Sequence, residues 1–234
     1  DIQGTAAVTL AGILSAQRIT GSALSEQTLL FQGAGEAATG IADLAVEAMV
    51  AEGLTKTQAR GRCWLFDSQG LVVSQRSDLA EHKRPYAHDH APVGTLLDAV
   101  KALRPTAIIG VAAVGGAFTE DVVRTMALLN KRPSVFALSN PTSKSECTAT
   151  QAYGWSDGRA LFACGSPFDP VTLEGRTHVP RQGNNSYIFP GVGLGVIVSG
   201  ASRVTDEMFM AAANELAAQV RDEDLRQGSL YPPL

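Results

Sequence analysis

Short apolar runs alternate with longer amphipathic runs along the chain. Each apolar run is rich in Leu, Ile, Val or Phe and is followed by a turn of glycine or polar residues. Runs of this length bounded by turns predict buried β-strands. The predicted strands cover Thr28–Gln32, Arg62–Phe66, Ala107–Val111, Ser134–Ser139 and Ala160–Ala163.

The amphipathic runs predict helices, because their apolar residues recur at the spacing of helical turns. The predicted helices cover Ala6–Gln17, Glu36–Ala51, Pro92–Leu103, Glu120–Leu129, Thr148–Tyr153 and Asp206–Val220. Strands that alternate with helices indicate a parallel sheet covered on both faces. The predicted fold is therefore α/β: a doubly wound, mostly parallel sheet of the Rossmann type, formed as one domain over residues 1–234.

The segment from Ser74 to Pro92 has no clear period. It is polar and carries three of the four histidines, so we expect a surface loop close to a ligand. His88-Asp-His90 offers two metal-ligand side chains, but no third ligand stands nearby in the sequence. An exposed loop is therefore the preferred interpretation of this pair over a metal site.

Composition narrows the class of protein. The net charge is −4 and no run of Lys and Arg is interleaved with aromatic residues, so nucleic acid is not an expected partner. Apolar stretches such as Val192–Val198 are much shorter than the roughly 18 to 20 residues that span a bilayer, and no signal pattern opens the chain. The three cysteines form no C-x-x-C arrangement, so neither a disulfide framework nor zinc is expected. We expect a soluble protein of the cytoplasm or an organelle matrix, neither secreted nor bound to a membrane.

A glycine-rich turn joins the first predicted strand to the second helix. It reads Gly33-Ala34-Gly35-Glu36-Ala37-Ala38, a G-x-G-x-x-A pattern. The first glycine permits a tight turn, the second lets the backbone approach a pyrophosphate, and the final alanine lets helix and strand pack closely. The strand-turn-helix context is the one this motif requires, so these six residues are the predicted dinucleotide-binding turn.

Asp67 ends the second predicted strand, where an acidic side chain reaches the adenosine ribose hydroxyls in such folds. Its separation from the glycines exceeds the usual ~20 residues, which requires a longer helix and loop between them. The alternative is that Asp67 only initiates the turn after it, as aspartate commonly does.

With the glycine turn in place, the whole chain resembles the malic enzymes. Four segments carry the resemblance in the same order: Asp1–Gly12, Gly33–Ala42, Ser139-Asn-Pro-Thr142 and Gly183–Gly191. The resemblance implies oxidation of malate by hydride transfer to NADP or NAD, followed by decarboxylation to pyruvate and CO₂. It also implies Mg²⁺ or Mn²⁺ acting as a Lewis acid, and a homo-oligomeric full-length enzyme.

Site residues follow from the resemblance position by position. Asp1 matches a metal ligand, although it is also placed to cap the helix after it. Thr5 matches a residue near the cofactor, and Asn140 one that contacts both malate and the nicotinamide end. Asn184 and Asn185 match a pair near the substrate, and the sequence does not say which of them points inward.

The family's acid/base Tyr and Lys, its other acidic metal ligands and its malate-binding Arg belong to a preceding domain that is absent from this chain. The resemblance therefore implies no catalytic residue within residues 1–234, and a chain that binds nucleotide but turns over malate poorly or not at all.

The choice of cofactor depends on the residues after Asp67. In the family a Ser at the next position with a downstream Lys goes with NADP, because the cation can pair with the 2′-phosphate. Here these residues correspond to Ser68 and Lys83, with Arg84 and Arg76 as further candidates. We therefore expect NADP, with NAD as the alternative.

Two other functions stay open. One is a non-catalytic NAD(P)-binding module that acts as a sensor or an assembly surface, which differs from an enzyme fragment in having no catalytic partner domain. The other is a different NAD(P) oxidoreductase, such as an amino-acid dehydrogenase, which does not account for the Ser139–Thr142 and Gly183–Asn185 segments together.

Overall fold

The computed structural model describes residues 2–233 and contains a seven-stranded sheet in the order β3-β2-β1-β4-β5-β6-β9. All neighbouring strands in it are parallel except β3, which pairs antiparallel with β2. The strands are β1 (Leu29–Gln32), β2 (Cys63–Asp67), β3 (Gly70–Leu71), β4 (Ala107–Gly110), β5 (Ser134–Ala137), β6 (Leu161–Cys164) and β9 (Arg181–Gln182). A separate hairpin is formed by β7 (Val171–Leu173) and β8 (Arg176–His178).

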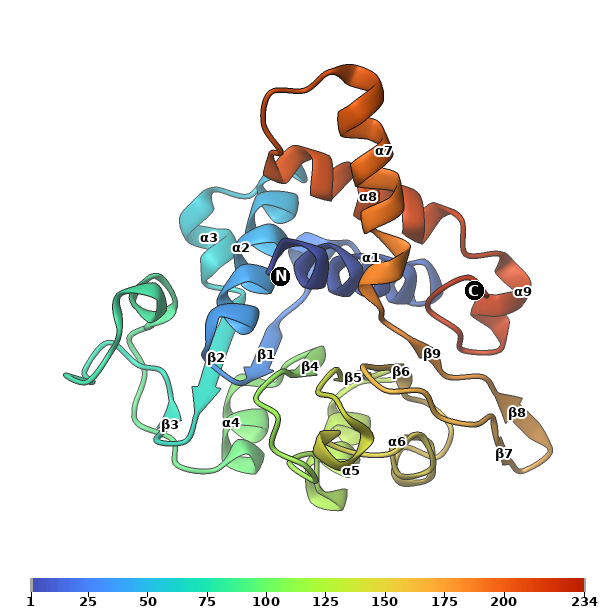
Figure 1. Cartoon of the computed structure of the whole chain (residues 1–234). Helices are drawn as coiled ribbons and strands as arrows, with labels where there is room; N and C mark the ends of the chain where they lie inside the picture. The colour runs from blue at the N-terminus through green and yellow to red at the C-terminus, as the bar shows by residue number, and fades with distance from the viewer. Residues whose placement is uncertain (1, 234) are drawn as a thin grey trace.

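Helices cover both faces of the sheet, as the alternating pattern predicts (Figure 1). The α-helices are α1 (Gln3–Thr20), α2 (Glu36–Ala51), α3 (Lys56–Arg60), α4 (Leu96–Leu103), α5 (Glu120–Leu129), α6 (Ala149–Trp155), α7 (Phe189–Ser199), α8 (Asp206–Ala218) and α9 (Asp222–Arg226). Four short 3₁₀ segments are η1 (Leu24–Glu26), η2 (Glu81–Tyr86), η3 (Thr142–Lys144) and η4 (Asn185–Tyr187).

Two apolar cores lie on the two sides of the sheet. Successive side chains of a strand point to opposite faces, so Leu29 and Phe31 pack with α1, α2 and α8, whereas Leu30 packs with α4, α5 and α6. All three side chains are fully buried. The continuous apolar runs in the sequence are therefore explained by burial on both faces, which confirms the doubly wound sheet.

The strand order creates a switch point between β1 and β4. From β1 the chain continues to β2 on one side, and β4, β5 and β6 extend the sheet on the other side. The connections at the carboxyl ends of β1 and β4 therefore diverge and leave a crevice, which is where open α/β sheets bind ligands.

The structure corrects two predictions between residues 74 and 103. The helix predicted from Pro92 begins at Leu96, because the Thr95 hydroxyl caps it by accepting a hydrogen bond from the Asp98 N–H at 3.1 Å. The segment expected to be a surface loop contains η2, in which Tyr86 is buried.

The sequence analysis missed α3, α7, α9 and the four strands β3, β7, β8 and β9. Each of these strands has only two or three residues, too few to show a period. In α7, the glycines 191, 193 and 195 weaken helix propensity, and the remaining side chains are apolar on all sides. Because none of its described residues is buried, no stripe of core positions marks this helix.

Candidate functional site

The glycine turn leads from β1 into α2 and needs its first glycine for two reasons. Gly33 has a φ of 132°, a conformation that L side chains rarely adopt, and its N–H donates to the Phe66 carbonyl at 2.8 Å. A Cβ at this position would also stand 3.1 Å from a methyl carbon of Val111, the residue that follows β4. Gly33 thus brings the turn close to the neighbouring strand connection.

The second glycine leaves open space above the helix terminus. Gly35 is the N-cap of α2, and a Cβ built on it would meet no atom within 4 Å. Ala38, one turn into the helix, is fully buried against the core. The first N–H groups of α2 have no partner within the helix, so the open space faces donors and the positive end of the helix dipole. This arrangement is suited to a pyrophosphate.

His82 contacts the same turn and was missed in the sequence. Its ring nitrogen Nε2 lies 3.1 Å from the carbonyl oxygen of Ala34, so η2 packs over the glycine turn. No spacing rule links His82 to Ala34, because the contact joins residues 48 positions apart.

Asp67 lies at the end of β2 in a cluster of charges. Arg76 reaches Asp67 at 2.8 Å and Asp78 at 2.7 Å, and Lys83 reaches Asp67 at 2.7 Å. Partial burial by itself would raise the pKa of Asp67, but the hydrogen bonds from Arg76, Lys83 and the Gln69 N–H lower it to about 2. The Gln69 contact, at 2.9 Å, is the turn-initiating role considered above. Asp67 is therefore held ionised and neutralised by two cations.

The ion pairs of Asp67 make the stability of the fold depend on pH. The pKa of Asp67 is lower in the folded state than its unfolded-state value of 3.8, so the ionised carboxylate stabilises the fold above pH 3.8. This stabilisation is lost as the pH falls toward 2. We expect the free energy of unfolding at neutral pH to be about 1 kcal/mol higher for wild type than for Asp67→Asn, after solvent screening is allowed for. Urea unfolding between pH 6 and pH 2 would measure this difference.

The difference in free energy of unfolding between wild type and Asp67→Asn should become smaller as the pH falls. A substitution that acts through packing alone would give a difference independent of pH. Asp89→Asn, at an exposed position, is the matched control for the loss of one carboxylate. An unchanged difference between pH 6 and pH 2 would show that the ion pairs do not stabilise the fold.

A buried glutamate supports the loop that carries Asn140. The Ser139 hydroxyl donates to Glu146 and accepts from the Ala113 N–H at 2.9 Å, and the Ser139 N–H donates to Glu146 at 3.3 Å. Glu146 is fully buried, and burial raises its pKa. These contacts join the loop after β4 to the loop after β5 and present Asn140 at the surface.

Asn184 and Asn185 follow β9 and have different surroundings. The side-chain oxygen of Asn184 accepts a hydrogen bond from the Ser186 N–H at 2.9 Å and so caps η4. Its NH₂ group remains a potential donor. Asn185 begins η4, which packs against α1, the helix that carries Thr5.

The sheet brings several of the predicted site residues to one edge. The turn after β1, Asp67 on β2, Asn140 after β5 and Asn184 after β9 all stand at carboxyl ends of strands that run in parallel. Ser68 is exposed beside Asp67. Asp1, the predicted metal ligand, lies outside the described residues 2–233.

The histidine pair in the polar segment has a structural role. The His88 ring nitrogen Nε2 lies 2.8 Å from the Cys63 carbonyl oxygen, and the His88 ring centroid is 4.4 Å from that of Trp64. Within residues 2–233, no three His, Cys, Asp or Glu side chains are grouped so that they could hold a metal ion.

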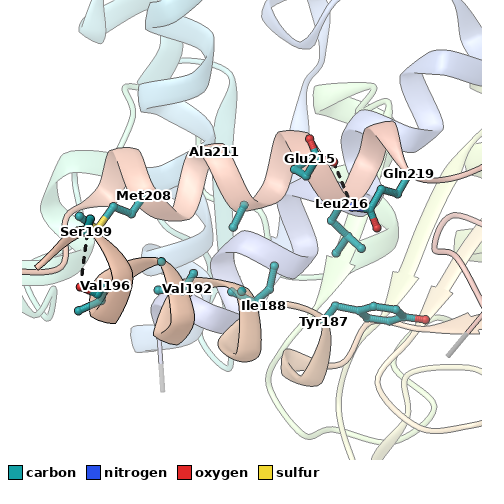
Figure 2. Close-up of a pocket in the computed structure, with 13 residues that line it drawn as sticks. Tyr187, Ile188, Val192, Val196, Ser199, Met208, Ala211, Glu215, Leu216 and Gln219 are labelled. Atoms are coloured by element: carbon teal, nitrogen blue, oxygen red, sulfur yellow. Dashed lines mark hydrogen bonds between the residues drawn. The ribbon is translucent and has the colours of Figure 1, made fainter. Parts of the chain in front are cut away.

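An apolar groove of about 520 Å³ separates α7 from α8 (Figure 2). Ile188, Val192 and Val196 line one side of it, and Met208 and Leu216 line the other. On α7 the side chains of Leu194, Ile197 and Val198 are 63%, 77% and 78% exposed.

No helix in the described part of the chain has both the length and the apolar character to cross a membrane.

Comparison with protein families gives one match over nearly the whole chain. Residues 2–234 match the family model described as "Malic enzyme, NAD binding domain". Similar proteins include the NADP-dependent malic enzyme of Mus musculus, 57% identical over all of this chain and 41% of that protein. The chloroplastic NADP-dependent malic enzyme 4 of Arabidopsis thaliana is 55% identical over all of this chain and 36% of that protein.

Solved structures show the same likeness. The malic enzyme of Entamoeba histolytica superposes with a TM-score of 0.76 and 26% identity over 99% of this chain and 44% of that one. That of Pyrococcus horikoshii superposes with a TM-score of 0.75 and 25% identity over 99% of this chain and 49% of that one. The chain thus spans less than half the length of these proteins.

Proposed function

Because the chain belongs to the malic enzyme family, we propose that it is the dinucleotide-binding part of an enzyme that oxidises malate and decarboxylates the product to pyruvate. One observation carries the proposal. The open space above Gly35, at the N-terminus of α2 and beside the switch point, is shaped for a pyrophosphate. The chain matches about 41% of the length of the mouse relative, so we propose the activity for a longer protein that contains it.

The residues of the glycine turn would hold the cofactor through the backbone. Gly33 to Ala38 would present N–H groups to the pyrophosphate, and the bound dinucleotide would supply the hydride acceptor. Thr5 is proposed to lie near it, and Asn140 to contact both cofactor and malate. Asn184 and Asn185 would bond the substrate carboxylate through their amides without adding charge.

NADP is the proposed cofactor, with NAD as the alternative. Asp67 would repel a 2′-phosphate if it stood alone, but Arg76 and Lys83 neutralise it. Arg76 is already shared between Asp67 and Asp78, whereas Lys83 pairs with Asp67 only. Of the two cations on Asp67, Lys83 is therefore the more able to turn toward a 2′-phosphate, next to the exposed Ser68.

The implied Mg²⁺ or Mn²⁺ is not accommodated by the described residues alone. They contain no group of three possible ligands, and Asp1 lies outside them. The remaining ligands and the acid/base Tyr and Lys are proposed to come from a preceding domain.

The exposed apolar side chains of α7 support the existence of such a domain. Three strongly exposed apolar side chains stand on this one helix, those of Leu194, Ile197 and Val198. Such a group is unfavourable in water. We propose that the rest of the enzyme packs on this surface. In the relatives, the part outside the matched region is longer than the matched region itself. We further propose that the full-length enzyme is a homo-oligomer of the cytoplasm or an organelle matrix.

Calorimetric titration of the chain with NADP and with NAD tests the cofactor. We expect tighter binding of NADP, and we expect Lys83→Gln to weaken NADP about tenfold with little effect on NAD, because it removes one charge-assisted contact. Lys101→Gln, on α4, is the matched control. A loss in Arg84→Gln in place of Lys83→Gln would overturn the assignment, and failure to bind either dinucleotide would contradict the proposed site.

A second measurement addresses the reaction. NADPH formation from malate and Mn²⁺ is expected to be absent with this chain alone and present when it is joined to its preceding domain. Dinucleotide binding with no turnover in the joined protein would instead support the alternative, a non-catalytic NAD(P)-binding module.

A further inference from the structure

A second hollow, of about 430 Å³, lies at the opposite edge of the sheet from the glycine turn. Two of its sides are the loops that lead into β5 and β6, so they stand at the amino ends of these strands. The hairpin of β7 and β8 forms another side. The residues that line this basic hollow are Lys131, Arg132, Asp157, Gly158, Arg159, Leu173, Glu174, Arg176 and His178.

Two of the arginines in the basic hollow have no acidic partner. In residues 2–233, neither Arg132 nor Arg176 forms an ion pair within 4.0 Å. Arg132 donates through Nε to the Arg159 carbonyl at 2.9 Å, and Arg176 through Nη2 to the Arg226 carbonyl at 2.6 Å. Since a guanidinium has five N–H groups, most donors of both side chains remain for a ligand.

Arg159 has a different role, because its Nη1 is engaged by backbone carbonyls and its charge faces Asp157. Its Nη1 donates to the Ala127 carbonyl at 2.8 Å, and its Nη2 lies 3.9 Å from Asp157. Arg159 therefore fixes the loop before β6 against the end of α5. The positive charge left for a ligand comes from Arg132, Arg176 and the exposed Lys131, and it exceeds the single negative charge of Glu174, which also lines the hollow.

These cations repel one another in the free chain. Burial lowers the pKa of Arg132, and the nearby Arg176 lowers it further. Burial, Arg176 and Arg132 also lower the pKa of His178, which is buried at the base of the hollow. Arg132 and Arg176 are close together and neither is ion-paired to a carboxylate, which is unfavourable, and an anion placed between them would reduce this cost.

The base of the hollow is formed by the buried His178, which packs on an aromatic ring. The His178 ring stacks on that of Tyr153, with ring centroids 4.4 Å apart. Tyr153 is fully buried, and its hydroxyl has no hydrogen-bond partner within the described residues.

We propose that the basic hollow binds a small anion with at least two negative charges, of the phosphate or polycarboxylate class. Planar guanidinium groups pair with both kinds of oxyanion through two parallel hydrogen bonds. The volume suits a small metabolite, and the net charge of −4 of the whole chain disfavours a long polyanion. The site is separate from the dinucleotide site and does not depend on it.

Calorimetry with inorganic pyrophosphate and with citrate, at one fixed low salt concentration, tests the proposal. We expect at least one of them to bind, and the tighter one identifies the class. Arg176→Gln should weaken that binding about tenfold, and Lys131→Gln by a smaller factor, since each removes one charged donor. Both side chains are exposed, so the fold should survive each change. Arg124→Gln is the control, because Arg124 lies outside the hollow and pairs with Glu120 at 2.7 Å.

Saturating NADP separates this site from the glycine turn. If the anion occupies the basic hollow, it should bind equally well with NADP present. Three results would overturn the proposal: no binding of either anion, equal loss in Arg124→Gln and Arg176→Gln, or displacement of the anion by NADP. The dinucleotide proposal is judged separately, by the NADP titration alone.

Discussion

Replacing Gly35 by valine is expected to reduce dinucleotide affinity at least about 100-fold, a loss of about 2.7 kcal/mol in binding free energy. The Cβ of the introduced valine would project into the open space at the N-terminus of α2, and its branched side chain would occupy the proposed place of the pyrophosphate. Calorimetric titration with NADP would measure the loss.

The fold of Gly35→Val should remain intact, because Gly35 has an ordinary φ of −87° and no protein atom lies within 4 Å of the added Cβ. Gly94→Val is the matched control, since Gly94 is also open and lies outside the turn. Undiminished affinity in a folded Gly35→Val variant would contradict the proposed site.

Replacing Gly165 by alanine is expected to destabilise the fold by about 3 kcal/mol, at the upper end of the usual range for overpacking. A Cβ at Gly165 would stand 1.9 Å from the carbonyl oxygen of Leu138 and 2.4 Å from its carbonyl carbon. These are backbone atoms next to Ser139 and Asn140, so the loop after β5 must move. Differential scanning calorimetry should show a melting temperature lower by about 6 to 12 °C.

Gly154→Ala provides the opposite case for the same change. Gly154 lies within α6 and has nothing within 4 Å of an added Cβ, so alanine should stabilise the helix by about 0.5 to 1 kcal/mol. If Gly165→Ala melted at or above the wild-type temperature, the close packing of the loops after β5 and β6 would be wrong.

The local features of the site were predictable because they depend on neighbours in the sequence. Gly33 and Gly35 stand between an apolar strand and a helix, and the spacing alone predicts the turn that the structure contains. The position of Asp67 at a strand end was predictable for the same reason. Whether Asp67 initiates a turn or bears a charge cluster was not, and in the structure it does both.

Long-range contacts gave no signal in the sequence. His82 meets Ala34 across 48 positions, and Glu146 lies beneath Ser139 because a Cβ-free Gly110 leaves space for it. The basic hollow joins loops before two strands to a hairpin that was not predicted at all. Such contacts follow from the order and register of strands, which periodicity does not specify.

The sequence by itself determined the class of fold, the glycine turn and the family resemblance, because burial on both faces of a parallel sheet imposes apolar runs and a tight strand-to-helix turn imposes glycines. Only the tertiary structure decided which charges meet: Arg76 and Lys83 pair with Asp67, and Arg132 lies near Arg176 with neither in an ion pair among the described residues. The reason is physical, since a hydrophobic pattern constrains each segment locally, whereas electrostatic pairing depends on distances that exist only after the segments have packed.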